Sequence, residues 1–274
     1  MALAGLTGPR QLDVLDGSPP CQGFSTAGKR NFNDDRNQLF REYVRLLRGL
    51  QPKVFVMENV SGMVKGKMKL IFAEIMRELK ASGYVVSARL LNAMWFGVPQ
   101  SRERMIFIGV REDLGIVPSH PKAESRPVTV GGGLLEVKDD GTGNRVGAHT
   151  KIWQAMKTVK PGMSQPGHHS HVRLNAMKPS PALRRAGDLA HYHYWHPVEH
   201  RVITMSECRR LASFPDSFQQ VGSVGLTWSR IGNSVPPLFM RAIALHIRHK
   251  ILASATGSSY LQVGRTNGRE GCAD

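Results

Sequence analysis

The sequence is poor in cysteine, in acidic residues and in long apolar runs, and each shortage excludes a class of protein. Its three cysteines, Cys21, Cys208 and Cys272, lie far apart, which excludes a disulfide framework and a multi-cysteine zinc site and favours a reducing, cytoplasmic location. No apolar run approaches the roughly 20 residues of a membrane helix, and the N-terminus lacks a signal-peptide pattern. We therefore expect no membrane segment. Hydrophobic residues at 41% exclude global disorder.

The scarcity of acidic residues leaves a large positive charge. Asp plus Glu is 21 and Lys plus Arg is 37, for a net charge of +16 over 274 residues. An excess of this size favours a polyanionic partner, most commonly nucleic acid. A solvated basic surface is the alternative that composition leaves open.

Residues 1–111 alternate strand-like and helix-like patterns, which is typical of βαβ units in a parallel, doubly wound sheet. We expect strands at 12–16, 53–57, 84–91 and 104–111. An apolar stripe over 39–50 predicts one helix, and Leu70, Ile71, Ile75 and Leu79 predict a second that ends near Gly83. These elements assign the segment to a catalytic domain of α/β class.

From about residue 112 to 200 the periodicity fades while Gly, Pro and His increase, which predicts a smaller, irregular domain. Regularity returns at Thr204, which forms a capping-box pattern with Glu207 and predicts a helix through Ser213. Pro236 and Pro237 mark the start of a last helix. We assign 112–205 to this irregular domain, 206–253 to a return to the catalytic domain, and 254–274 to a flexible tail.

Two candidate reactive groups follow the first two predicted strands. Cys21 lies in GSPPCQGFS after strand 12–16, and Glu58 lies in MENV after strand 53–57. Open α/β sheets bind ligands at the carboxyl ends of their strands, where a thiolate is able to act as a nucleophile and a carboxyl as a proton donor. A space-filling thiol and a helix-capping carboxylate remain the alternatives for each residue taken alone.

A third group of polar residues enters the last predicted strand. Gln100, Arg102 and Arg104 alternate, so their side chains are expected on one face. The two guanidiniums suit a carbonyl or a phosphate. A salt bridge with Glu103 at the edge of the sheet is the alternative.

Taken together, the motifs PPCQGFS, ENV, QSRER, RRLASFPDSF and IGNSVPP occur in the order found in cytosine-5 DNA methyltransferases of bacterial or phage type, which this chain resembles. The resemblance covers nearly the whole chain outside residues 112–195 and the tail. It implies a Rossmann-like fold that uses S-adenosylmethionine, with a smaller, irregular target-recognition domain over 112–205.

The resemblance also implies roles for the candidate residues. Cys21 matches the nucleophile that adds to carbon 6 of cytosine, and Glu58 matches the glutamate that binds or protonates ring nitrogen 3. Arg104 matches the arginine that holds the carbonyl oxygen at position 2, with Arg102 in support. The methyl group then passes from the cofactor to carbon 5.

Double-stranded DNA is the implied partner, with the target base flipped out of the duplex. Gln22 and Ser25 are expected to hold the flipped nucleotide, and the recognition domain to read base edges. From Arg173 to Arg210, a stretch that includes Arg184 and Arg185, basic residues exceed acidic ones by four; we expect these two arginines to contact DNA. The interleaved histidines, among them His168, His169 and His171, lack zinc-ligand spacing, so we expect no metal site.

One departure from the family concerns the cofactor. Family members begin with a strand and glycine-rich turn that cradles S-adenosylmethionine, and this sequence reaches Pro19 without one. The matching cofactor contacts are Pro20, Leu39, Asn233 and Ser234. We therefore expect an incomplete fold and weak or no cofactor binding by this chain alone. A truncated product, a misassigned start, or half of a split enzyme whose partner chain carries the missing motif would each explain the departure.

Three other functions compete with a DNA methyltransferase. A DNA-binding remnant or regulatory subunit shares every feature except turnover. A tRNA cytosine-5 methyltransferase has a very similar site, although the long recognition region favours duplex DNA. A cysteine hydrolase is disfavoured because no histidine lies in a recognisable partner motif.

Overall fold

The computed structural model describes residues 12–19, 39–64, 69–124, 126–142, 151–184 and 193–255. The chain divides into two compact units. The first comprises 1–89, 105–120 and 244–274, and the second comprises 90–104 and 121–243.

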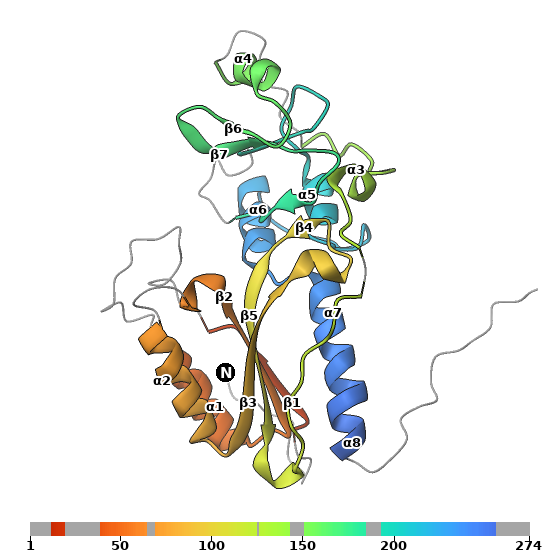
Figure 1. The fold of residues 1–274 in the computed structure, drawn as a ribbon. Helices are drawn as coiled ribbons and strands as arrows, with labels where there is room; N and C mark the ends of the chain where they lie inside the picture. Colours follow the sequence, from red (N-terminus) through yellow and green to blue (C-terminus); the bar gives the residue numbers. More distant parts are fainter. Residues whose placement is uncertain are drawn as a thin grey trace, which may run out of the picture. The chain divides into compact units, whose positions relative to one another are not determined.

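A four-stranded sheet forms the centre of the first unit (Figure 1). Its order is β1-β2-β5-β3, with bounds β1 Val14–Gly17, β2 Val54–Val60, β5 Glu103–Arg111 and β3 Tyr84–Asn92. β1 and β2 are parallel neighbours, with Val14 opposite Val54 and Gly17 opposite Met57. The first four residues of β2 are buried, as expected of a strand covered on both faces. All four predicted strands are therefore present near their predicted positions.

β5 runs antiparallel to both of its neighbours, so the prediction of a parallel sheet is wrong for this strand. The amide of Arg111, at the end of β5, donates to the carbonyl of Lys53 just before β2. The next amide, of Glu112, donates to the carbonyl of Gly83 just before β3. A parallel crossover needs about a dozen or more residues, and only residues 93–102 join β3 to β5. The short connection therefore returns the chain antiparallel, between β2 and β3.

Helices cover both faces of the sheet (Figure 1). α1 (Leu39–Leu50) and α2 (Lys69–Lys80) lie on one face, and residues 244–255 lie on the other. This last segment contains the end of α7 (Pro237–His246), the π-helical η8 (Ile247–Leu252) and α8 (Ala253–Ala255). The core on the α1 and α2 side includes Leu47, Phe55, Ile75, Leu79 and Phe107. Both amphipathic helices were predicted, although Leu70, placed on the apolar stripe, is 78% exposed.

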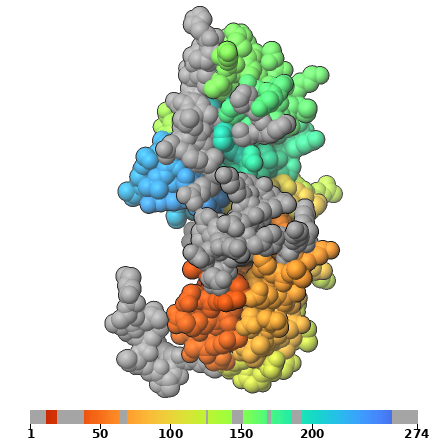
Figure 2. Space-filling view, turned by 90° about the vertical axis from the view of Figure 1, so that its left-hand side faces the viewer, coloured from red at the N-terminus to blue at the C-terminus, as the bar shows by residue number. Residues whose placement is uncertain are grey.

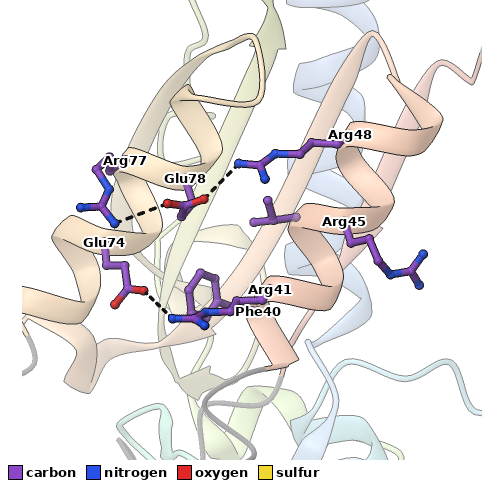
Figure 3. A pocket seen from close by; sticks show the side chains of 8 residues that line it. Phe40, Arg41, Arg45, Arg48, Glu74, Arg77 and Glu78 are labelled. Carbon is purple, nitrogen blue, oxygen red and sulfur yellow. Dashed lines mark hydrogen bonds and ion pairs between the residues drawn. The ribbon is translucent and has the colours of Figure 1, made fainter.

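A groove of about 380 Å³ runs between the outer sides of α1 and α2 (Figure 3). Figure 2 shows these two helices side by side, in red-orange and orange, on the face of the molecule that they cover. Ion pairs cross the groove: Arg41 with Glu74 at 3.2 Å, and Arg48 with Glu78 at 3.0 Å. Arg45 points away from them and pairs with Glu42 on its own helix. The ion pairs across the groove thus join α1 to α2, and all the residues that line the groove belong to these two helices.

The second unit consists of short elements. They are η5 (Ala93–Phe96), β4 (Gln100–Ser101), α3 (Val130–Gly133), α4 (Lys151–Thr158), β6 (Ser164–Gln165), β7 (His168–Arg173), β8 (Ser180–Pro181), β9 (Tyr194–Trp195), α5 (Met205–Leu211), α6 (Val224–Asn233) and most of α7. β6, β7 and β9 form a small sheet, and β4 pairs with β8. Single-turn helices η3 (Ser61–Val64) and η6 (Glu112–Leu114) belong to the first unit. The sequence predicted an irregular region here and missed the small sheet.

The predicted capping box at Thr204 is confirmed. The Thr204 hydroxyl accepts from the Glu207 amide at 3.1 Å, and the Glu207 carboxylate accepts from the Thr204 amide at 2.7 Å. Arg201, which is 7% exposed, makes a bidentate pair with the same carboxylate, with both bonds at 2.8 Å. α5 therefore begins at a fully hydrogen-bonded carboxylate that also anchors the preceding loop.

The two units do not coincide with the boundaries drawn from the sequence. Residues 206–243 cluster with 121–205, because Cys208, Leu211, Trp228 and Ile231 share a core with Tyr194 and Leu183. The functional assignment of these segments stays a prediction.

No helix in the described part of the chain has the length and apolar character needed to cross a bilayer.

Candidate active site

Several of the predicted site residues lie outside the described part of the chain. These are Pro20, Cys21, Gln22, Ser25 and Arg185. The described residues do include the strands on either side of the cysteine motif, together with Glu58, Arg102, Arg104, Leu39, Arg184, Asn233 and Ser234.

The carboxyl ends of β1 and β2 lie side by side. Gly17, the last residue of β1, is opposite Met57, and Glu58 is the next residue of β2. Glu58 is half-buried, between the buried Met57 and Asn59. The predicted adjacency of these two strand ends is therefore confirmed.

Asn59 joins the two motifs directly. Its side-chain amide donates to the carbonyl of Pro19 at 3.2 Å in a buried hydrogen bond, and its side-chain oxygen accepts from the amide of Val60. Asn59 is 3% exposed, so this bond is shielded from water. The start of PPCQGFS is thus fastened to the residue after Glu58. The sequence analysis missed this role; an amide side chain directly after the apolar run of β2, beside Glu58, was the available signal.

A second carboxylate, Asp16, lies near this edge of the sheet. Its side chain keeps contact with solvent, but partial burial of the carboxyl raises its pKa, and the negative charge of Glu58 raises it further. A hydrogen bond from the amide of Gly17 acts in the opposite direction. Asp16 and Glu58 are therefore close enough for the charge of Glu58 to act on the carboxyl of Asp16.

Arg102 points into the interior of the second unit. It is 3% exposed, and its guanidinium donates to the carbonyl of Leu183 at 2.9 Å and to that of Gly232 at 2.8 Å. The side-chain oxygen of Gln100 accepts from the amide of Leu183. Gln100 and Arg102 thus share a face, as predicted, and that face is packed against other segments. Arg102 holds the IGNSVPP motif, through Gly232, to the segment that ends at Arg184.

Arg104 has different surroundings. It is half-buried, and its Nη1 donates to the main-chain oxygen of Glu103 at 2.7 Å. Arg104 belongs to the second unit and Glu58 to the first, so their convergence on one ring stays a prediction.

The predicted cofactor contacts are of suitable chemical types. Leu39, at the start of α1, is 39% exposed and offers an apolar surface. In the second unit, Asn233 is exposed at the end of α6, and the Ser234 hydroxyl donates to the carbonyl of Ile231 at 2.7 Å. An apolar contact and an amide fit the adenine and polar parts of S-adenosylmethionine, so these residues fit portions of that cofactor.

Arg184 presents an exposed side chain from a fixed backbone. Its amide donates to the hydroxyl of Tyr194, and its carbonyl accepts from the indole of Trp228, both at 3.2 Å. Such fixed exposure suits a contact to a polyanion.

The described histidines of the second unit are held by structural contacts. His171 stacks on Trp195, with ring centroids 5.9 Å apart, and His196 accepts from the amide of Glu199 at 2.9 Å. Within the described residues, no three His, Cys, Asp or Glu side chains gather as metal ligands would.

The described fold is of α/β class with two strand ends side by side at one edge, and a solved methyltransferase structure shares this fold. Sequence comparison places the chain further: the profile of the C-5 cytosine-specific DNA methylase family matches residues 6–249. The chain belongs to this family, whose members are DNA cytosine-5 methyltransferases.

Individual proteins that the chain is similar to are also methyltransferases by name. The chain is 36% identical to the type II methyltransferase M1.HphI of Haemophilus parahaemolyticus, an alignment that covers 86% of this chain and 68% of the relative. It is 33% identical to M.XorII of Xanthomonas oryzae pv. oryzae, covering 88% and 69%. A prophage-encoded E. coli protein described as a DNA modification methyltransferase is 26% identical, with a TM-score of 0.68 over 85% of this chain and 78% of that structure.

Proposed function

We propose that this chain carries the catalytic residues that transfer a methyl group from S-adenosylmethionine to carbon 5 of a flipped cytosine in DNA, through a covalent adduct with Cys21. A separate chain that carries the glycine-rich cofactor motif would complete the S-adenosylmethionine site. The observation that carries the proposal is the buried hydrogen bond from Asn59 to Pro19, which ties the cysteine motif to the strand end that bears Glu58. Pro19 is two residues before Cys21 in the sequence, and Asn59 is the residue after Glu58.

Cys21 and Glu58 divide the activation of the ring. The thiolate of Cys21 forms a bond to carbon 6, while Glu58 gives its proton to ring nitrogen 3. The electron pair of the 5,6 double bond is thereby directed to carbon 5, which becomes an enamine-like nucleophile.

Pro20, Leu39, Asn233 and Ser234 would hold S-adenosylmethionine, which when bound would supply the methyl group to carbon 5 and leave as S-adenosylhomocysteine. A base then removes the proton from carbon 5, the 5,6 double bond re-forms as the Cys21 sulfur leaves carbon 6, and ring nitrogen 3 returns its proton to Glu58. Arg104 holds the carbonyl oxygen at position 2 through these steps. Arg102 acts indirectly, because its buried bonds hold neighbouring segments in place.

Binding to duplex DNA is the second part of the proposal. Extruding a base costs a few kcal/mol, which contacts to the backbone must offset. The net charge of +16 supplies long-range attraction. Gln22 and Ser25 are assigned to the flipped nucleotide, and Arg184 and Arg185 to the DNA backbone.

A trapping experiment tests the proposal. A random-sequence duplex pool with 5-fluorocytosine in place of cytosine is incubated with the full chain and S-adenosylmethionine, and adducts are separated under denaturing conditions. We expect a covalent complex whose cross-linked peptide contains Cys21, and none with Cys21→Ser.

The matched control is Cys208→Ala. Cys208 is fully buried, and burial raises the pKa of its thiol, so its loss should leave adduct formation intact. A DNA-mobility shift without an adduct in the unaltered chain would favour the DNA-binding remnant. An adduct formed with tRNA that contains 5-fluorocytosine, and not with the DNA pool, would favour a tRNA cytosine-5 methyltransferase. An adduct that still forms with Cys21→Ser would refute the mechanism.

A further inference from the structure

A buried tyrosine hydroxyl lies between the ends of the two strands that lead to the proposed catalytic groups. Tyr43, on α1, is 6% exposed. Its hydroxyl is 2.9 Å from the carbonyl oxygen of Val56 in β2 and 3.3 Å from that of Leu15 in β1. Burial raises the pKa of Tyr43, and the negative charge of Asp16 raises it further. The hydroxyl therefore stays protonated and donates to these carbonyls.

The ring of Tyr43 also packs against the last residue of β1. A β-carbon at Gly17 would come within 2.6 Å of Tyr43 Cε2 and 2.8 Å of Cδ2. A glycine is required here because any other residue would displace the ring. The Tyr43 side chain thus packs its ring against the backbone of β1 and directs its hydroxyl at carbonyl oxygens of both β1 and β2.

These contacts lie close to the proposed chemistry in sequence and in register. Val56 is two residues before Glu58, and Gly17 is two residues before Pro19, whose carbonyl is bonded by Asn59. Tyr43 therefore contacts both strands within two residues of Glu58 and within four residues of Pro19.

We propose that Tyr43 is a positioning residue that sets the distance between the carboxyl ends of β1 and β2, and with it the alignment of Cys21 with Glu58. This inference rests on the proposed function, because it assigns Cys21 and Glu58 to one site. Tyr43 touches neither substrate nor cofactor in this assignment; it acts through the two strands. Since a misplacement of about 1 Å is able to cost about 100-fold in rate, a loss of this hydroxyl should be visible in turnover.

The chain offers a matched control at the other end of β2. Tyr84 is fully buried, and its hydroxyl donates to the carbonyl of Pro52 at 2.7 Å. Tyr84→Phe therefore removes the same kind of bond as Tyr43→Phe, but near the amino end of the strand. A general loosening of the fold would affect both variants, whereas a positioning role predicts an effect of Tyr43→Phe alone.

Proximity is measured by cross-linking, independently of turnover. Glu58→Cys, in a Cys272→Ser background, is treated with dibromobimane, which becomes fluorescent when both of its arms have alkylated thiols; peptide mapping identifies the Cys21 link. We expect Tyr43→Phe to slow this cross-link about tenfold, and Tyr84→Phe to change it less than about twofold. With Glu58 retained, Tyr43→Phe should lower kcat about tenfold and change KM for DNA less than about twofold.

The outcomes separate the two proposals. Equal cross-linking with and without Tyr43→Phe, or equal slowing by Tyr84→Phe, overturns the positioning role and leaves the proposed function standing. No link between Cys21 and the cysteine at position 58 in any variant overturns the shared site itself, and the positioning role with it.

Discussion

Replacement of Arg102 by methionine should destabilise the protein far more than the same change at Arg104. Methionine keeps much of the length and volume of the side chain but removes the guanidinium. The carbonyls of Leu183 and Gly232 then lose their partners in the interior, where water does not easily replace them. The segments around residues 183 and 232 lose the link that joins them.

The magnitude follows from the two bonds. Hydrogen bonds that involve a charged group contribute about 1.5–3 kcal/mol each, so the loss of both lowers the free energy of unfolding by about 3–6 kcal/mol. Since about 1 kcal/mol shifts the melting temperature of a protein of this size by about 2–4 °C, Tm should fall by about 6–24 °C. Arg102→Lys, which reaches one carbonyl at a time, should lie between methionine and the unaltered chain.

Thermal unfolding followed by far-ultraviolet circular dichroism measures this effect. Arg104→Met is the control, because Arg104 is half-buried and its Nη1 donates to the main-chain oxygen of the neighbouring Glu103; its Tm should change by less than about 3 °C while methyl transfer is lost. A Tm for Arg102→Met within about 2 °C of the unaltered chain would refute the structural role derived for this residue.

Three further predictions concern stability. Gly109→Ala in β5 should lower the free energy of unfolding by about 2 kcal/mol or more, because the new β-carbon would come within 2.0 Å of the fully buried Phe55 ring; an unchanged urea midpoint would contradict the packing. Thr204→Ala should lower it by about 1 kcal/mol through loss of the cap to Glu207, and a Thr204→Ser variant with the same loss would argue against the cap. Burial, assisted by the charge of Arg89, lowers the pKa of His120 from 6.5 to about 4. The folded state therefore resists protonation, and its stability is intact above the unfolded pKa of 6.5 and falls as the pH drops towards 4. Urea titrations at pH 7.5 and pH 5 should show about 2 kcal/mol of this loss, which His120→Asn should abolish; an equal loss in that variant would assign the pH dependence to other groups.

The candidate site could be predicted from sequence to the extent that it depends on strand ends. The apolar runs before Gly17 and Glu58 indicated two strands, and the rule that ligands bind at their carboxyl ends placed both motifs at one edge. The bond from Asn59 to Pro19 could not be predicted, because it spans 40 residues of sequence and exists only in the observed register of β1 and β2.

The alternation of Gln100 and Arg102 shows where this kind of prediction stops. Period-two spacing predicted a common face for Gln100, Arg102 and Arg104, and the first two of these both bond to Leu183. It carried no information on whether that face meets substrate or the protein interior, since both environments accept polar side chains that have partners. Arg102 and Gln100 bond to Leu183, which is 81 and 83 residues away along the chain, respectively. These contacts show that both side chains face the protein interior.

By itself the sequence determined what depends on neighbours within a few residues: the two amphipathic helices that cover the sheet, the capping box at Thr204, the strand segments, and the ordered motifs that identify the family. Tertiary structure alone decided the insertion of β5 between β2 and β3, the inward direction of Arg102 and the placement of the Tyr43 hydroxyl over two strands. The physical reason is range. Periodicity and capping act over about one helical turn or a few strand residues, whereas strand order and buried polar contacts depend on which distant segments exclude water from one another when the whole core closes.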